Sequence, residues 1–229
     1  MTSKGARYGA NDMIRTGQDY RDAIQTNRDI YVDGTRIEDV TTHSTFAPLV
    51  DLRAHIYDMQ HDAAHRDILA TTVNGQSCTI AAALPFSQAD WWAKRRATDR
   101  ILSNIGGIAT RTGDETIGEF WSLYDCRDAL VDMDPQFARN VDAHIAASRT
   151  DDLFRISANT DPKGDRSRSP TDQNPDMLLR VVRETDAGLI VRGAKFETGA
   201  PYADMAYTKP NLANWGDDLP EDYAVGICR

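Results

Sequence analysis

Apolar side chains recur at helical spacing through the first part of the chain. Between residues 13 and 25 the apolar and aromatic positions return every three or four residues, which predicts an amphipathic helix. Residues 48–59 show the same period and predict a second helix. Its apolar stripe consists of Leu49, Leu52, Ile56 and Met59.

A longer helix is predicted to begin after Ser87. Asp90 lies three residues later, and this pair is typical of a capping box, in which each side chain binds the other residue's backbone N–H. Apolar residues continue at helical spacing to Ile105, and we expect this central helix to be buried. Two further helices are predicted over residues 120–130 and 135–147, the latter with proline in its first turn.

Two dipeptides predict tight turns. Asp33-Gly34 lies between the β-prone runs 30–32 and 35–37, and an Asp-Gly pair in that position favours a hairpin with a type I′ turn. Asn74-Gly75 predicts another turn. The helical part of the chain is therefore expected to contain a small hairpin.

The pattern changes near Leu153, where β-prone runs replace helical ones. Residues 153–156 predict a strand, and residues 177–183 and 189–191 predict a hairpin. Residues 223–228 form a final β-like run that stops at the end of the sequence. A strand there would expose a pairing edge, so we expect the sequence to be cut short; the alternative is a true terminus in the middle of a sheet.

Helices before this change and strands after it predict an α+β fold in two parts. A chain of 229 residues with 41% hydrophobic content can bury a substantial core. We assign residues 1–152 to a mainly helical domain and residues 153–229 to a β-rich domain that is incomplete.

Charge and cysteine content exclude several classes of protein. The net charge of −9 argues against nucleic acid as a partner, because non-specific binding to nucleic acid needs a basic surface. The three cysteines, Cys78, Cys126 and Cys228, are widely spaced and predict neither disulfides nor a zinc site. No apolar run suggests a signal peptide or a membrane span, so a cytoplasmic protein is expected.

A polar loop between two β-prone runs is the strongest candidate for ligand binding. It reads Asn159-Thr160-Asp161-Pro162-Lys163-Gly164-Asp165-Arg166. Lys163 and Arg166 can meet phosphate oxygens, and Gly164 allows positive φ and a close approach of the backbone to a ligand. The other interpretation is a solvated loop of turn-forming residues.

Several motifs in this order resemble the oxygenase component of the 4-hydroxyphenylacetate 3-monooxygenase family. They are Thr16-Gly17, Arg28-Asp29-Ile30-Tyr31-Val32-Asp33-Gly34, Asp39-Val40-Thr41-Thr42-His43, the loop from Thr160 to Arg166, and Val191-Arg192-Gly193-Ala194-Lys195. The resemblance covers nearly the whole chain but only about the N-terminal half of such an oxygenase. It implies a helical N-terminal domain, the start of a β-barrel-like middle domain and a missing C-terminal helical bundle, in an acyl-CoA-dehydrogenase-like fold.

The resemblance also implies a chemistry. A separate flavin reductase supplies FADH2 by diffusion, O2 converts it to a flavin C4a-hydroperoxide, and a small aromatic substrate attacks the distal oxygen. Such a site must exclude water. A homo-oligomer is implied for the full-length protein.

Site residues follow from the matched motifs. The resemblance places flavin contacts at Ala158, Asn159, Lys163, Gly164, Asp165 and Arg166, and in a second segment at Glu197, Thr198 and Gly199, with no metal. That second segment is one residue shorter than is usual in the family.

The substrate pocket departs from the family pattern. Where the family has Arg-Thr-Pro-Asp-Tyr and a His near the phenol, this chain has Arg111-Thr112-Gly113-Asp114-Glu115 and Ser157. Arg111 can stabilise a phenolate or orient a carboxylate, Glu115 favours a cationic group, and Ser157 can donate a hydrogen bond but cannot replace imidazole as a base. Arg111, Glu115 and Ser157 are the predicted catalytic residues.

Two other functions stay open. The related 4-hydroxybutyryl-CoA dehydratase has a similar loop, but its iron–sulfur cluster needs cysteines, and this sequence has none between residues 87 and 124. A non-catalytic module that binds flavin or a partner is the second alternative.

Two pairs of side chains are weaker candidates for metal or substrate binding, because no sequence motif supports either pair. His61 and His65 have the spacing of two metal ligands on a helix, but no third ligand is evident, and we favour a surface role. Of Trp91 and Trp92, at most one is expected to line a pocket for an aromatic substrate, and the other to pack in the core.

Overall fold

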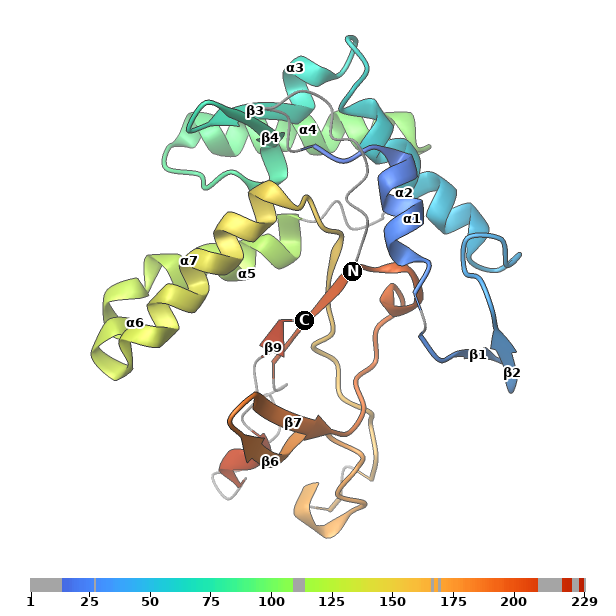
Figure 1. Ribbon diagram of the computed structural model, residues 1–229, viewed down its shortest axis with the longest axis vertical. Coiled ribbons are helices and arrows are strands. Elements are labelled where there is room, and N and C mark those ends of the chain that lie inside the picture. The colour runs from blue at the N-terminus through green and yellow to red at the C-terminus, as the bar shows by residue number, and fades with distance from the viewer. Residues whose placement is uncertain are drawn as a thin grey trace. The chain divides into compact units, whose positions relative to one another are not determined.

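The computed structural model describes most of the chain and divides it into two compact units, Met1–Phe154 and Arg155–Arg229. The described residues are 14–26, 28–108, 114–165, 167–168, 170–209, 220–223 and 227–228; of residues 114–117, 119, 170, 227 and 228 only the backbone is described. The elements of each unit are labelled in Figure 1.

The first unit is mainly helical. Its helices are α1 (Gly17–Ile24), α2 (Ala47–Met59), α3 (Arg66–Leu69), α4 (Gln88–Asn104), α5 (Asp114–Asp125), α6 (Arg127–Met133) and α7 (Pro135–Thr150), with a 3-10 turn at Ile80–Ala82. Its strands are β1 (Ile30–Val32), β2 (Thr35–Ile37), β3 (Ala70–Val73) and β4 (Gln76–Thr79).

Both predicted turns are confirmed. β1 pairs antiparallel with β2 around Asp33-Gly34, and β3 pairs antiparallel with β4 around Asn74-Gly75. All four turn residues have positive φ, as a type I′ turn requires. The strands around the second turn were not predicted, because Ala70–Val73 and Gln76–Thr79 lack strong β-alternation.

Side-chain caps fix where three helices begin. Thr16 and Asp19 form a capping box at α1, and Ser87 and Asp90 form the predicted one at α4. At α7 the Asp134 carboxylate accepts from the N–H of Gln136, two residues later. The first helix therefore begins at Gly17, later than predicted, and residue 13 lies outside the described residues.

Two helix predictions were wrong in detail. The helix expected over residues 120–130 is interrupted at Cys126, where α5 ends and α6 follows. The apolar stripe expected on α2 is confirmed only in part. Ile56 and Met59 are buried as predicted, whereas Leu49 is 40% exposed and Val50, outside the stripe, is buried. The buried face of α2 therefore contains the second half of the predicted stripe and extends to neighbouring positions that the stripe did not include.

The central helix is less buried than expected. Ile56, Met59 and Leu69 pack with Ala97, Ile101 and Ile105 in the main hydrophobic cluster. Within α4, however, only Lys94, Ala97 and Ile101 are buried.

Both tryptophans at the start of α4 are exposed, Trp91 by 54% and Trp92 by 58%. The expectation that one of them packs in the core was wrong. Both residues are apolar in type, but neither lies on the buried face of α4.

The second unit contains two small sheets. β5 (Arg155–Ser157), β8 (Met205–Thr208) and β9 (Ile227–Cys228) form one, in the order β5-β8-β9, with β5 parallel to β8 and β9 antiparallel to it. β6 (Arg180–Thr185) and β7 (Gly188–Arg192) form the other, which is the predicted hairpin. Short 3-10 turns lie at Pro170–Asp172, Ala200–Tyr202 and Glu221–Tyr223.

Mixed helix and strand content agrees with the predicted α+β class. The strand expected at 153–156 begins two residues later, and of the run expected at 223–228 the structure describes only β9 as strand. The described strands do not close into a barrel. No helix in the described ranges is both long enough and apolar enough to cross a membrane.

Candidate functional site

The predicted ligand loop leaves the end of β5. Ser157 and Ala158 are buried there. The N–H of Ala158 donates to the carbonyl of Tyr207 at 2.7 Å, and the hydroxyl of Thr208 donates to the carbonyl of Ala158 at 2.9 Å. Asn159 Nδ2 donates to Ser157 Oγ at 2.5 Å. Bonds to β8 and within the loop thus hold the first part of the loop in place.

The second family segment lies against this loop. The N–H of Phe196 donates to the carbonyl of Thr160 at 2.8 Å. Lys195 Nζ lies 2.6 Å from Asp161 Oδ1, and both side chains are about nine-tenths buried, with exposed fractions of 11% and 9%. Lys195 also donates to the carbonyl of Lys209. A buried ion pair therefore joins two motifs that are far apart in the sequence.

Residues 197–199 continue from that ion pair toward β5. Glu197 Oε1 accepts a hydrogen bond from the N–H of Gly199, and Thr198 is exposed. A side chain at Gly199 would bring its Cβ to 2.9 Å from Ile156 Cγ2, so this segment packs directly on the strand. The structure thus brings Glu197, Thr198 and Gly199 close to the strand that carries Ser157.

Gly164 in the loop and Gly193 in the Val191–Lys195 motif each lie close to other atoms of the same chain. Gly164 has φ of +51°, as predicted, and a Cβ there would lie 2.5 Å from Met177 Sδ and 2.6 Å from Gln173 Oε1. The space beside Gly164 is therefore filled by the protein's own side chains. Gly193 has φ of +135°, and a Cβ there would collide with the carbonyl of Leu178.

Asp165 belongs to the internal structure of the loop. Its N–H donates to Gln173 Oε1 at 2.7 Å, and its carboxylate accepts from the hydroxyl and the N–H of Ser167. The Ser167 hydroxyl, followed by the Ser167 N–H, lowers the pKa of Asp165 below its ordinary value. Its charge is thus stabilised by the loop itself.

Lys163 is different from its neighbours. Its side chain is exposed, and within the described ranges it forms no hydrogen bond or ion pair. It is therefore available to an anion that approaches unit Arg155–Arg229 from solvent.

The remaining predicted residues are not placed. Arg111 and Arg166 lie outside the described residues, and only the backbone of Glu115 is described, within α5. Their roles, and those of the other predicted site residues, stay predictions.

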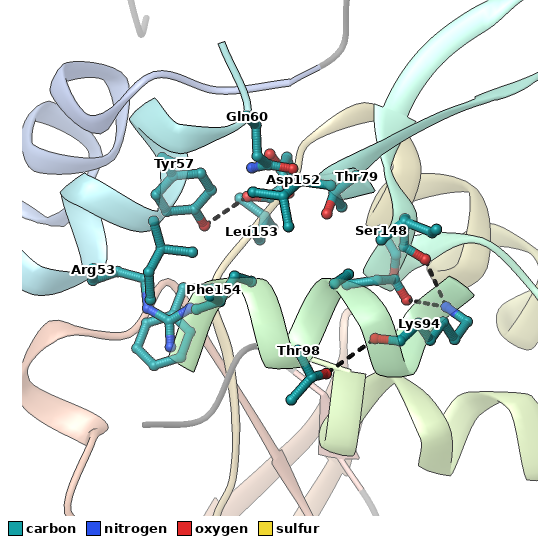
Figure 2. Close-up of a pocket in the computed structure, with 16 residues that line it drawn as sticks. Arg53, Tyr57, Gln60, Thr79, Lys94, Thr98, Ser148, Asp152, Leu153 and Phe154 are labelled. Carbon is teal, nitrogen blue, oxygen red and sulfur yellow. Dashed lines mark hydrogen bonds between the residues drawn. The ribbon is translucent and has the colours of Figure 1, made fainter. Parts of the chain in front are cut away.

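The helical unit contains a small cavity, lined by both apolar and polar side chains, that the sequence did not suggest. Figure 2 shows Tyr57, Gln60 and Asp152 on one side of it and Lys94 on the other. Tyr57 donates to the carbonyl of Asp152 at 2.8 Å, and Lys94 donates to two backbone carbonyls of the preceding 3-10 turn. Arg53 and Gln60 are polar residues that are buried in and just after α2. Their side chains are polar in the sequence, but nothing in the sequence indicates that they are buried.

Its volume of about 50 Å³ limits what it can hold. Gln60 Oε1 is buried without a hydrogen-bond partner in the described structure. An ordered water, which needs roughly 10–15 Å³ and a few polar partners, fits this space and would donate to Gln60. We therefore assign the cavity a structural role.

Other candidate groups are separate from the loop. His61 and His65 lie in the turn after α2 rather than on a helix; His61 Nε2 contacts the carbonyl of Arg15, and His65 Nδ1 contacts Arg100. No group of three potential metal ligands is found in the described part of the chain. Cys78 is buried, and burial raises the pKa of its thiol, which makes it a poor nucleophile.

Comparison with known proteins identifies the family. The sequence pattern of the family described as 4-hydroxyphenylacetate 3-hydroxylase N terminal matches residues 16–228. The chain belongs to this family.

Known proteins that are similar to this chain include the oxygenase components that its motifs resemble. The oxygenase component of 4-hydroxyphenylacetate 3-monooxygenase from Thermus thermophilus is 30% identical over 208 residues, which are 87% of this chain and 41% of the relative. A crystal structure of such an oxygenase component, complexed with FAD and 4-hydroxyphenylacetate, superimposes with a TM-score of 0.82 at 28% identity, covering 94% of this chain and 44% of that one.

A relative with different chemistry also matches. 4-Hydroxybutyryl-CoA dehydratase/vinylacetyl-CoA-Delta-isomerase from Clostridium aminobutyricum is 26% identical over 225 residues, which are 94% of this chain and 44% of the relative. The chain thus spans about two fifths of the length of the curated relatives it matches.

Proposed function

We propose that this chain forms the flavin-binding N-terminal part of the oxygenase component of a two-component monooxygenase. The enzyme would use FADH2 and O2 to hydroxylate a phenolic or other aromatic substrate. Membership of the family supports this, as does the FAD found in solved relatives.

The observation that carries the proposal is the contact between the two motif segments. The Asp161–Lys195 ion pair and the Thr160–Phe196 hydrogen bond bring the loop of residues 157–165 together with residues 197–199. Asp161 neutralises Lys195 within the protein, whereas Lys163 is exposed and would bind an anion.

Each residue then has a distinct role. Lys163, together with Arg166, would bind the FAD diphosphate. Asn159 orients the Ser157 hydroxyl through their hydrogen bond, and the burial of Ser157 and Ala158 keeps that end of the loop free of bulk water. When bound, reduced FAD supplies the activation of O2 and the delivery of one oxygen atom to the aromatic ring.

Partners follow from the same proposal. A separate reductase would provide reduced flavin by diffusion, and the full-length protein would be a cytoplasmic homo-oligomer. The division into a helical domain of residues 1–152 and a β-rich domain of residues 153–229 belongs to this proposal as well.

The substrate is expected to differ from 4-hydroxyphenylacetate. Glu115 and Ser157 stand where the family's Tyr and His would contact the phenol, and a carboxylate at 115 disfavours an anionic substrate. We predict slow hydroxylation of 4-hydroxyphenylacetate by a full-length protein with this sequence. Product formation with an added flavin reductase, NADH, FAD and O2 measures this, and rapid, tightly coupled turnover would show the substrate prediction to be wrong.

A second candidate is a module that binds flavin without turning over substrate. Flavin binding together with oxygen-dependent product would indicate an enzyme, whereas flavin binding without product would indicate the module. A dehydratase is disfavoured, since no cysteine occurs between residues 87 and 124 to hold a cluster.

A further inference from the structure

An open groove lined by aromatic rings lies on the helical unit. Phe86, Trp91, Trp121, Tyr124 and Asp125 line it, and its volume is about 540 Å³. We call it the aromatic groove. Pockets for small molecules usually measure about 300–1,000 Å³, so this groove has the size of a ligand site.

The rings form two edge-to-face pairs. Trp91 and Trp121 have centroids 5.5 Å apart at 77°, and Phe86 and Tyr124 have centroids 6.4 Å apart at 71°. Phe86 is 76% exposed and Trp91 54% exposed. Such exposed faces favour a planar aromatic ligand, because stacking removes apolar surface from water at little cost in side-chain entropy.

A carboxylate lies among the described side chains that line the groove. Of the described residues that line it, Asp125 alone is charged, and its exposed carboxylate forms no hydrogen bond or ion pair with another described side chain. The nearby Arg127, whose guanidinium lies 5.8 Å from the Tyr124 ring centroid, is paired with Asp142 at 2.7 Å. The arginine is therefore already neutralised, while Asp125 is available to a ligand.

We propose that the aromatic groove binds an aromatic compound that carries an ammonium group. Its ring would stack against Trp91 and Phe86, and its ammonium group would pair with Asp125. An anionic aromatic acid would be repelled by the same carboxylate and by the net charge of −9. The groove lies within the unit Met1–Phe154, so this proposal does not depend on flavin binding by the loop.

Calorimetric titration of the chain with three phenols that differ in charge tests the proposal. Tyramine is cationic, 4-ethylphenol neutral and 4-hydroxyphenylacetate anionic at neutral pH. We expect tyramine to bind about three- to fivefold more tightly than 4-ethylphenol, as an exposed ion pair allows, and the acid to bind most weakly. Equal binding of all three, or no binding of tyramine, would overturn the proposal.

Matched variants locate the binding. D125N should reduce tyramine affinity to that of 4-ethylphenol, whereas D128N, at an exposed carboxylate outside the groove, should not. W91L should weaken both phenols about tenfold through lost stacking, and W92L, on the same helix but outside the groove, should leave them unchanged. Loss of binding in the control variants instead would contradict the assignment.

Two further readouts distinguish a ligand in the groove from flavin binding and from self-association. The affinity of the same variants for FAD should equal that of wild type. A failure of the groove proposal can therefore be distinguished from a failure of the flavin-binding proposal. If W91L instead abolished a concentration-dependent dimer while tyramine did not bind, a second copy of the chain would occupy the groove, and the ligand proposal would be wrong.

Discussion

Two lysines of the β-rich unit show how far residue type alone predicts a role. Lys163 and Lys195 both belong to motifs shared with the family. Lys195 is buried and paired with Asp161, while Lys163 is exposed. The sequence identified the loop as cationic, but only the fold shows which carboxylate neutralises which cation, because the pair joins residues 34 positions apart.

Removal of one member of the buried pair should strongly destabilise this unit. D161N would leave the Lys195 ammonium buried without its counter-charge, at a cost of about 3 kcal/mol in the free energy of unfolding. Urea unfolding measures the change. The variant D176N, at more exposed ion pairs with Arg180 and Arg192, should cost less than about 1 kcal/mol.

The double variant D161N/K195M provides the internal check. It should be more stable than the sum of the two single variants predicts, since the second substitution removes the unpaired charge. Additive losses would show that the two groups do not interact.

At the scale of elements, local signals predicted best. The Asp33-Gly34 and Asn74-Gly75 turns and the Ser87/Asp90 capping box depend on neighbouring residues only, and all three are present. Burial was predicted less well, because Leu49 and Trp92 are apolar residues whose exposure is decided by distant elements. The small cavity beside Gln60 is likewise formed by several elements and has no local signature.

The capping box at α4 should contribute measurably to stability. S87A removes the acceptor for the Asp90 N–H and should lower the free energy of unfolding of the helical unit by about 1 kcal/mol. S103A, which removes an exposed hydroxyl near the other end of the same helix, should change it by less than about 0.5 kcal/mol. Far-UV circular dichroism during urea unfolding follows both.

The effect of S87A should depend on pH. The Ser87 hydroxyl is the main reason that the pKa of Asp90 lies below its ordinary value in the folded protein. A lowered carboxyl pKa stabilises the folded state above the unfolded-state pKa, and this contribution is lost as the pH falls through the folded-state value. The difference in stability between wild type and S87A should therefore be larger at neutral pH than in strong acid, and an unchanged difference would exclude the carboxylate as its source.

At the scale of the whole molecule, the motifs predicted family membership and the α+β class, and the family match confirms the former. The structure leaves two of the three predicted catalytic residues untested, because Arg111 lies outside the described residues and only the backbone of Glu115 is described. Flavin binding is the central claim, and it can be measured directly on this chain.

Fluorescence titration of FAD and, without oxygen, FADH2 into K163M and wild type tests that claim most directly. R183M removes an equal charge from an exposed position on β6 and serves as the control. We predict that K163M binds flavin about three- to tenfold more weakly than wild type, as expected for loss of one exposed cation–phosphate contact, and that R183M binds normally. Equal affinity of K163M and wild type, or no binding of flavin by wild type, would contradict the account.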